Sequence, residues 1–377
     1  MGNSLSTENL SQRFPLQVGQ FPVNNVLRNS IGNLQISAHP ETHEPRTILT
    51  ISFDSDEVLD SLKKGLDDIA LAKHNGCEVF VQPHAVEVHD KRLICSPSSF
   101  LVVLDHFELN LEDVIRSNYL SHFFGYESQV WAMLFDLVSV IQCSSRNKIR
   151  GHFLHPRSIC WMDKEKRWGF LHPAFFPEIS NYSEAMAANL HFCSPELFAQ
   201  IFSGRKKFHV TDQDRSDMFS LGLITLFILC FDSGEIDLTQ VYIRGQCMVD
   251  GLYLQRVING LEKLNVSDLM MRVLSEMLNE IEHLRMSSTG FFDFLQKHRA
   301  DLQNPNFRDH DKIFDNYMEM KSSNMMLSMN KDAFGKEVTG PKVTRPSTVL
   351  AAERKNSIEP GHKVVVVDKK KDNGFYF

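Results

Sequence analysis

The sequence predicts an α+β protein in which a small β-rich part with one helix comes before a larger, mostly helical part. Residues 48–53 alternate apolar and polar side chains with the period of a strand, and the apolar residues of 58–71 recur on one side of a helix. From Glu127 onward the apolar residues recur with helical spacing. Residues 216–231 are apolar nearly all round, which is typical of a helix buried at the centre of a domain.

Further elements complete both parts in chain order. The β-rich part, residues 29–118, contains four more strand patterns, at 34–37, 86–88, 92–94 and 100–104. The helical part, residues 119–300, ends in two amphipathic helices, at 266–282 and 288–298. Residues 1–28 are rich in Asn, Ser and Gln without periodicity and predict a flexible arm. Residues 301–377 have few apolar positions and predict a largely disordered extension.

Composition narrows the classes of function. The formal charge of −7 gives no general attraction to nucleic acid, whose phosphates require a clustered basic face, so no nucleic-acid partner is expected. The longest apolar run, 218–231, is too short to cross about 30 Å of hydrocarbon. The seven cysteines are scattered singly, without the close pairs of a structural zinc site, and predict reduced thiols in a cytoplasmic protein with no metal site.

Two short motifs predict modification of the chain ends. The sequence after Met1 presents Gly2 with Ser6 in the spacing of an N-myristoylation signal, which predicts peripheral attachment to a membrane surface. A single acyl chain binds a membrane only marginally, and Arg13 and Arg28 are the sole basic residues of 1–30. At the other end, Ser357 follows Arg and Lys in the pattern of a basophilic-kinase phosphorylation site.

Several landmarks of the helical part resemble the eukaryotic protein-kinase family and occur in that family's order. Ser194-Pro195-Glu196 is similar to the motif that ends the activation segment, and the stretch from Asp217 to Gly222 is similar to the D-x-x-S-x-G start of the central buried helix. Arg285 stands where the family places the arginine that pairs with the motif glutamate. The resemblance implies a bilobal protein-kinase-like fold, in which Asp217 accepts hydrogen bonds from the backbone of the catalytic loop.

The same resemblance implies that the chemistry has been lost. The stretch 154–159 is similar to L-K-P-E-N-I, anchored on Pro156. This register places Phe153 at the catalytic aspartate, Ser158 at the metal-binding asparagine, and His172 at the D-F-G aspartate. Phenylalanine cannot accept the proton of a substrate hydroxyl, and serine is a poor replacement for an amide ligand to Mg²⁺.

The β-rich part also lacks the residues with which the family binds the nucleotide. No G-x-G-x-x-G precedes the first strands, and the nearest stretch, 30–34, has one glycine. The strand of 48–53 has no lysine, and Thr50 or Ser52 takes its place. Asp67 or Asp68 falls near the helix glutamate that would pair with that lysine. We therefore expect no bound cofactor, with ATP binding in the absence of catalysis as the alternative that stays open.

The sequence favours a pseudokinase that acts as a scaffold or allosteric partner of another protein. Two alternatives stay open. One is a divergent but active Ser/Thr protein kinase, which Mg-ATP binding and phosphorylation would distinguish. The other is a structural subunit of a larger assembly, whose C-terminal extension would become ordered only within that assembly.

Overall fold

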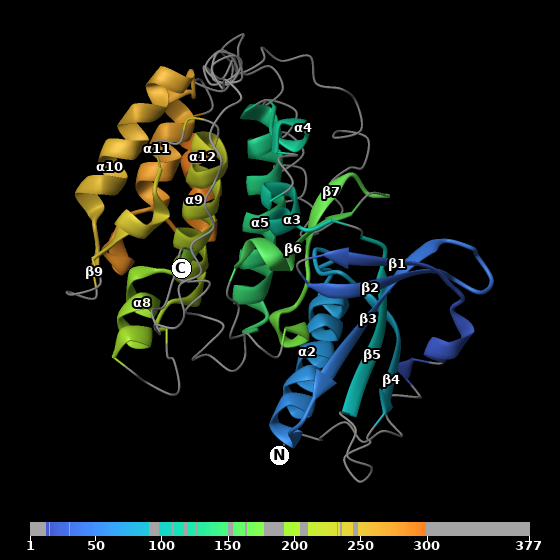
Figure 1. The fold of residues 1–377 in the computed structure, drawn as a ribbon. Coiled ribbons are helices and arrows are strands. Elements are labelled where there is room, and N and C mark those ends of the chain that lie inside the picture. Colours follow the sequence, from blue (N-terminus) through green and yellow to red (C-terminus); the bar gives the residue numbers. More distant parts are fainter. Residues whose placement is uncertain are drawn as a thin grey trace, which may run out of the picture.

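A computed structural model gives the arrangement of the chain (Figure 1). It describes residues 13–298 except 15, 30, 90–97, 108, 117–119, 126, 150–153, 163, 177–191, 204–209, 232, 234–235 and 244–247. The fold is mixed α+β, with a five-stranded antiparallel sheet followed by a group of helices. The strand pattern predicted at 92–94 lies outside the described residues.

The sheet has the order β1-β2-β3-β5-β4. Its strands are β1 (Val23–Asn29), β2 (Gly32–Ala38), β3 (Pro45–Phe53), β4 (Pro83–His89) and β5 (Ser98–Asp105). The central strand β3 pairs with β2 on one side and β5 on the other. Its odd-numbered residues from Leu49 to Phe53 belong to the main core, whereas Ile48 belongs to a separate cluster. Each face of the sheet is therefore covered by a different part of the chain.

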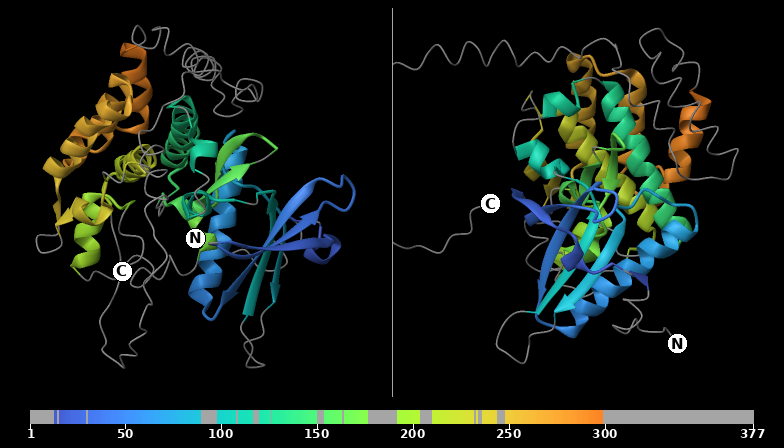
Figure 2. Two further views of the ribbon diagram at one scale, coloured as in Figure 1. Left: turned by 45° about the horizontal axis from the view of Figure 1, so that its top comes forward. Right: turned by 90° about the vertical axis from the view of Figure 1, so that its right-hand side faces the viewer.

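Helix α2 (Asp56–His74) covers the face of the sheet that is turned toward the other helices, as both views show (Figures 1 and 2). Its N-terminus is capped by Ser55, whose side chain accepts a hydrogen bond from the N–H of Val58 at 3.4 Å. Two acidic residues in its first turn stabilise the helix, because their negative charges interact favourably with the positive end of the helix dipole. The apolar side of the helix is buried against the sheet, through Val58, Leu59, Leu62, Leu66, Ile69 and Ala72.

The opposite face of the sheet is covered by residues that come before β1. Val18, in the 3₁₀ helix η1 (Val18–Gln20), and Phe21 pack with Ile48 and Val103 in the second apolar cluster. Phe14 is buried in the main core. The sequence assigned residues 1–28 to a flexible arm, but Phe14, Val18 and Phe21 are buried, and β1 begins at Val23. The cause is that a few large apolar side chains, without periodicity, are sufficient to hold a short segment on an apolar surface.

The helical part surrounds one central helix, α9 (Gln213–Cys230), which begins three residues before the predicted stretch 216–231 and is buried nearly all round. The other elements are α3 (Leu111–Arg116), α4 (Leu120–Phe123), α5 (Glu127–Arg146), η3 (Pro156–Ser158), β6 (Ile159–Met162), β7 (Arg167–Phe170), η4 (Pro173–Phe175), α8 (Pro195–Phe202), η6 (Leu238–Val241), β8 (Tyr242–Ile243), β9 (Met248–Val249), α10 (Gly251–Gly260), η8 (Leu261–Leu264), α11 (Asp268–Met277), η9 (Glu282–Leu284) and α12 (Ser288–Lys297). Within the described residues, no helix is both long and apolar enough to cross a membrane.

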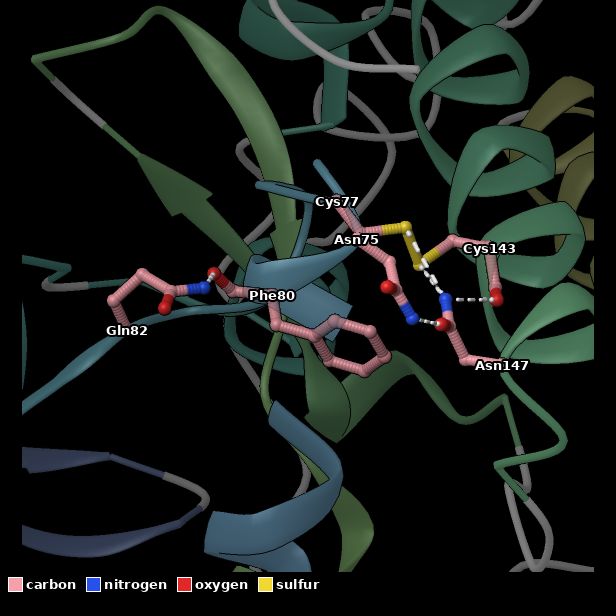
Figure 3. The surroundings of a disulfide bond; sticks show 6 residues. All are labelled: Asn75, Cys77, Phe80, Gln82, Cys143 and Asn147. Atoms are coloured by element: carbon pink, nitrogen blue, oxygen red, sulfur yellow. Dashed lines mark hydrogen bonds between the residues drawn. A yellow bond between two sulfur atoms is a disulfide. The ribbon is translucent and has the colours of Figure 1, made fainter. Parts of the chain in front are cut away.

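The sheet and the helices share one continuous core, and direct bonds connect them. The backbone of Val81, just before β4, donates to Phe170 of β7 at 3.0 Å, and Phe170 donates to Val79 at 3.1 Å. A disulfide joins Cys77, after α2, to Cys143 of α5 (Figure 3). The prediction of reduced thiols is therefore wrong for these two cysteines, which are 66 positions apart and are brought together only by the fold. Of the other described cysteines, Cys160, Cys193 and Cys230 carry no disulfide and are buried.

Candidate functional site

The structure brings Arg285 and Glu196 together across 89 positions of sequence. The guanidinium donates to both carboxylate oxygens, from Nη1 at 2.8 Å and from Nη2 at 3.1 Å. Its other donors reach the backbone carbonyls of Asn279, Arg215 and Glu280. The guanidinium also lies 4.8 Å from the ring centre of Phe219. Because the arginine is almost fully buried, these contacts balance a charge that would otherwise be costly.

Asp217 anchors the start of α9 to the loop that precedes η3. Its carboxylate accepts a hydrogen bond from Gln213 Nε2 at 3.0 Å. Burial raises the pKa of Asp217 well above its usual range, and hydrogen bonds from Gln213 and the Leu154 backbone act in the opposite direction. Close packing accounts for Gly222, because a Cβ there would lie 3.0 Å from the Leu278 side chain. The motif residues of α9 thus fix a loop and allow close packing.

Ser194 and Pro195 lie where the chain enters α8. The Ser194 hydroxyl is fully buried and lies 2.7 Å from the hydroxyl of Ser216 in α9, which is a hydrogen-bonding distance. Pro195 is the first residue of α8, where its missing N–H costs nothing. These two residues therefore join α8 to α9 next to the pair of Glu196 and Arg285.

The predicted catalytic loop forms a tight turn at η3, which begins at Pro156. Ser158 is buried, and its hydroxyl donates to the His155 carbonyl at 2.8 Å and accepts from the His155 N–H at 3.3 Å. The serine thus serves the turn's own backbone. Phe153 lies outside the described residues, as do Gly2 and Ser357.

His172 precedes η4 and lies beside α2. Its Nδ1 accepts a hydrogen bond from the Ala174 N–H at 3.2 Å, and its Nε2 lies 3.6 Å from Oδ2 of Asp68. Burial lowers the pKa of His172 and outweighs the opposing effect of Asp68, so the neutral imidazole is favoured. Since Nδ1 accepts, the proton of a neutral ring lies on Nε2 and faces Asp68. The structure also separates the two predicted acids, because Asp67 instead bonds Arg13 at 2.9 Å.

Gly65 is a site residue that the sequence interpretation missed. A Cβ at this position would lie 2.6 Å from Cβ of Ala174 and 2.9 Å from Nδ1 of His172. Only a residue without a side chain therefore lets α2 approach η4 this closely. The available signal was a glycine in the interior of a predicted helix, where it costs about 1 kcal/mol relative to alanine. Such a glycine often has a packing role.

The face of β3 that is turned toward α2 is apolar. Leu49 and Ile51 are buried in the main core with Leu62 and Leu66 of α2. Thr50 and Ser52, the residues expected at the family's lysine position, are exposed on the opposite face, so neither is turned toward α2. The alternation of residues 48–53 predicts a strand, but it does not say which face of the strand the helix covers.

A second missed residue, Thr47, satisfies the backbone at the end of β5. Its hydroxyl donates to the carbonyl of Phe107 at 2.9 Å and accepts from the N–H of Phe107 at 3.1 Å. Both residues are fully buried. A neighbouring donor and acceptor on the backbone is the kind of polar pair that orients a ligand in an apolar pocket. Here the hydroxyl of Thr47 already binds both the carbonyl and the N–H of Phe107.

The described residues of this site make packing contacts and hydrogen bonds with one another. They contain no cluster of side chains that could bind a metal ion. His172 lies against Asp68, and the face of β3 that is turned toward α2 is apolar. No protein-family model matches the chain, and no curated protein matches it.

Proposed function

We propose that this chain is a kinase-like protein without phosphoryl-transfer activity, which acts by binding another protein. In this proposal the sheet with α2 and the helices from α3 onward correspond to the two lobes of a protein-kinase fold. The support for the fold is the pair of Arg285 and Glu196 with Asp217 beside the loop at Pro156. These contacts are the structural landmarks that the resemblance implies. They stabilise a fold whether or not the protein catalyses a reaction.

The observation that carries the loss of activity is the contact among His172, Asp68 and Gly65. A metal-binding acid is expected at His172, but the imidazole there is buried, faces an aspartate and caps its own turn. Phosphoryl transfer depends on Mg²⁺ and cationic groups that neutralise charge developing on the phosphoryl oxygens. A neutral imidazole packed against α2 supplies neither a carboxylate ligand nor a fixed positive charge.

The residues of β3 support the proposal independently of His172. A lysine that contacts nucleotide phosphates would extend from β3 toward α2, where Leu49 and Ile51 lie. Thr47 uses the nearby backbone groups of Phe107, which a heterocyclic ligand would otherwise have to bind. Replacement of these internal contacts by a nucleotide would therefore cost hydrogen bonds and apolar burial.

The experiment is thermal unfolding of the full chain with ATP and Mg²⁺, with ATP and EDTA, and with neither. A ligand at about 100 times its Kd would raise the free energy of unfolding by about 2.7 kcal/mol. We expect the same melting temperature in all three conditions, with ATP at millimolar concentration in the two that contain it. An active kinase run in parallel is the positive control, and incorporation of labelled phosphate into a generic substrate is measured on the same samples.

A rise in melting temperature that requires Mg²⁺, together with phosphate transfer, would support the divergent active kinase instead. A rise with ATP alone and no transfer would retain the binding role but add a nucleotide to it. The variant His172→Ala controls for transfer by the site itself, because any true activity that uses this position would change in it.

A further inference from the structure

The ends of α2 and α5 lie together at the junction of the sheet and the helices. Each helix is followed by a left-handed residue, Gly76 with φ 78° and Lys148 with φ 54°. After Gly76, the N–H of Cys77 donates a hydrogen bond to the carbonyl of Ala72 at 2.9 Å. Cys143 lies in the last turn of α5. The two chain reversals place these cysteines opposite each other, with their Cα atoms 6.3 Å apart.

The bonded sulfurs are buried beneath a thin cover. Cys77 and Cys143 have 2% and 0% of their surface exposed, but Gly76 and Glu78 on both sides of Cys77 are exposed. The side-chain amides of Asn75 and Asn147 hydrogen-bond to each other next to the disulfide (Figure 3). A small local opening of this turn would therefore expose the bond to a solution thiol.

Asn147 also places a hydrogen-bond donor at the sulfurs. Its Nδ2 donates to the Cys143 carbonyl at 2.9 Å and lies 3.5 Å from Sγ of Cys143 and 3.9 Å from Sγ of Cys77. A donor in this position stabilises a thiolate, which is the species formed when the bond is cleaved by exchange. The situation of Cys193 differs, because burial raises its pKa to about 12 and keeps it a thiol.

We propose that Cys77 and Cys143 form a reversible, redox-sensitive brace that fastens the end of α2 to α5. In the reducing direction, one glutathione thiolate attacks a sulfur of the disulfide and forms a mixed disulfide, releasing a protein thiolate. A second glutathione releases the other sulfur. Overall, two glutathione molecules give two electrons and two protons to the protein, which becomes a dithiol, and leave as glutathione disulfide. Glutathione disulfide drives the reverse reaction.

The brace controls how firmly α2 is held at the junction. In the oxidised state a covalent bond closes the turn after α2 onto α5. In the reduced state the turn after α2 is still held by the amide pair of Asn75 and Asn147, by the backbone bonds of Val79 and Val81 with Phe170, and by the hydrogen bond from Arg167 to the Glu78 carbonyl, but no covalent bond joins it to α5. The turn 75–81 is therefore expected to open more often after reduction. This inference is independent of whether the protein transfers phosphate.

The experiment equilibrates the full chain in glutathione buffers of different ratio, quenches with an alkylating reagent, and measures the linked peptide of Cys77 and Cys143 by mass spectrometry. Hydrogen exchange of residues 75–81 is measured on the same samples. We expect the linked peptide to disappear and return as the ratio is reversed, with exchange at least about tenfold faster in the reduced form. Cys77→Ser should exchange at the reduced rate in both buffers, whereas Cys230→Ser should behave like the unchanged protein.

Two results would overturn the proposal. If the linked peptide persists in excess reduced glutathione in the folded protein, the disulfide is a permanent crosslink. If it fails to form in glutathione disulfide, the two cysteines are not a redox pair. Both readouts use the unchanged protein, so the test stands even where Cys77→Ser does not fold.

Discussion

The buried carboxyl of Asp136 should make the protein less stable as the pH rises, and Asp136→Asn should remove that loss. Asp136 lies on α5, and its Oδ2 accepts a hydrogen bond from the Trp168 N–H of β7 at 2.9 Å. Burial raises its pKa from 3.8 to about 7, against the opposing effects of this hydrogen bond and of Arg167. An asparagine can accept the same bond through its side-chain oxygen without acquiring a charge.

The sign and the size follow from the two pKa values. Between 3.8 and about 7 the folded state holds a proton that the unfolded state has lost, so a rise in pH favours unfolding. The stabilisation is complete below 3.8 and is gone above about 7. Each pH unit in this window costs about 1.4 kcal/mol, which gives an upper limit of about 4 kcal/mol at pH 8.

The assay is urea unfolding of both proteins at several pH values from 5 to 8. At pH 5 the asparagine variant should be equal to or less stable than the unchanged protein, because its amide N–H₂ needs new partners. The difference should then shift in favour of the variant by up to about 3 kcal/mol as the pH reaches 7. Asp60→Asn, at an exposed position of α2, is the control. A difference that stays constant from pH 5 to 8 would refute the reasoning.

Three further substitutions test the contacts of the candidate site by urea unfolding. Thr47→Val should cost about 1–3 kcal/mol because it leaves the N–H and carbonyl of Phe107 buried without a partner; an equal loss in Thr47→Ser, which keeps the hydroxyl, would contradict this cause. Gly65→Ala should cost about 1–3 kcal/mol by overpacking, whereas Gly19→Ala, which has nothing within 4 Å of its added Cβ, should be nearly neutral. Arg285→Met should cost about 3 kcal/mol because it strands a glutamate charge, and a loss below 1 kcal/mol would argue against that role for the ion pair.

Elements with a strong local pattern could be predicted from the sequence. The apolar spacing that begins at Glu127 corresponds to α5, and the apolar run of 216–231 corresponds to the buried helix α9. The strand β1 could not be predicted, because as an edge strand it has one neighbour and carries polar residues such as Asn24 and Asn25 on its exposed surface. A strand with little buried surface has little reason to alternate.

Some contacts of the candidate site could also be predicted from the sequence, and others could not. The pairing of Arg285 with Glu196 could be expected from motif order, because a buried carboxylate needs a cation. The choice between Asp67 and Asp68 could not be made from sequence, since adjacent helix positions point about 100° apart and the direction of η4 was unknown. Thr47 gave no signal, since a single threonine in a strand is common and its partner, Phe107, lies 60 positions away.

The chemical group at each position can be read from the sequence, including the histidine at 172 and the lack of a lysine in 48–53. The elements whose periodicity is local can be read from it as well. The positions of Leu49 and Ile51 against α2, of Asp68 against His172 and of Cys77 against Cys143 become known only from the fold. The physical reason is that composition and periodicity are properties of neighbouring residues, whereas these contacts depend on how distant segments pack to bury one shared core.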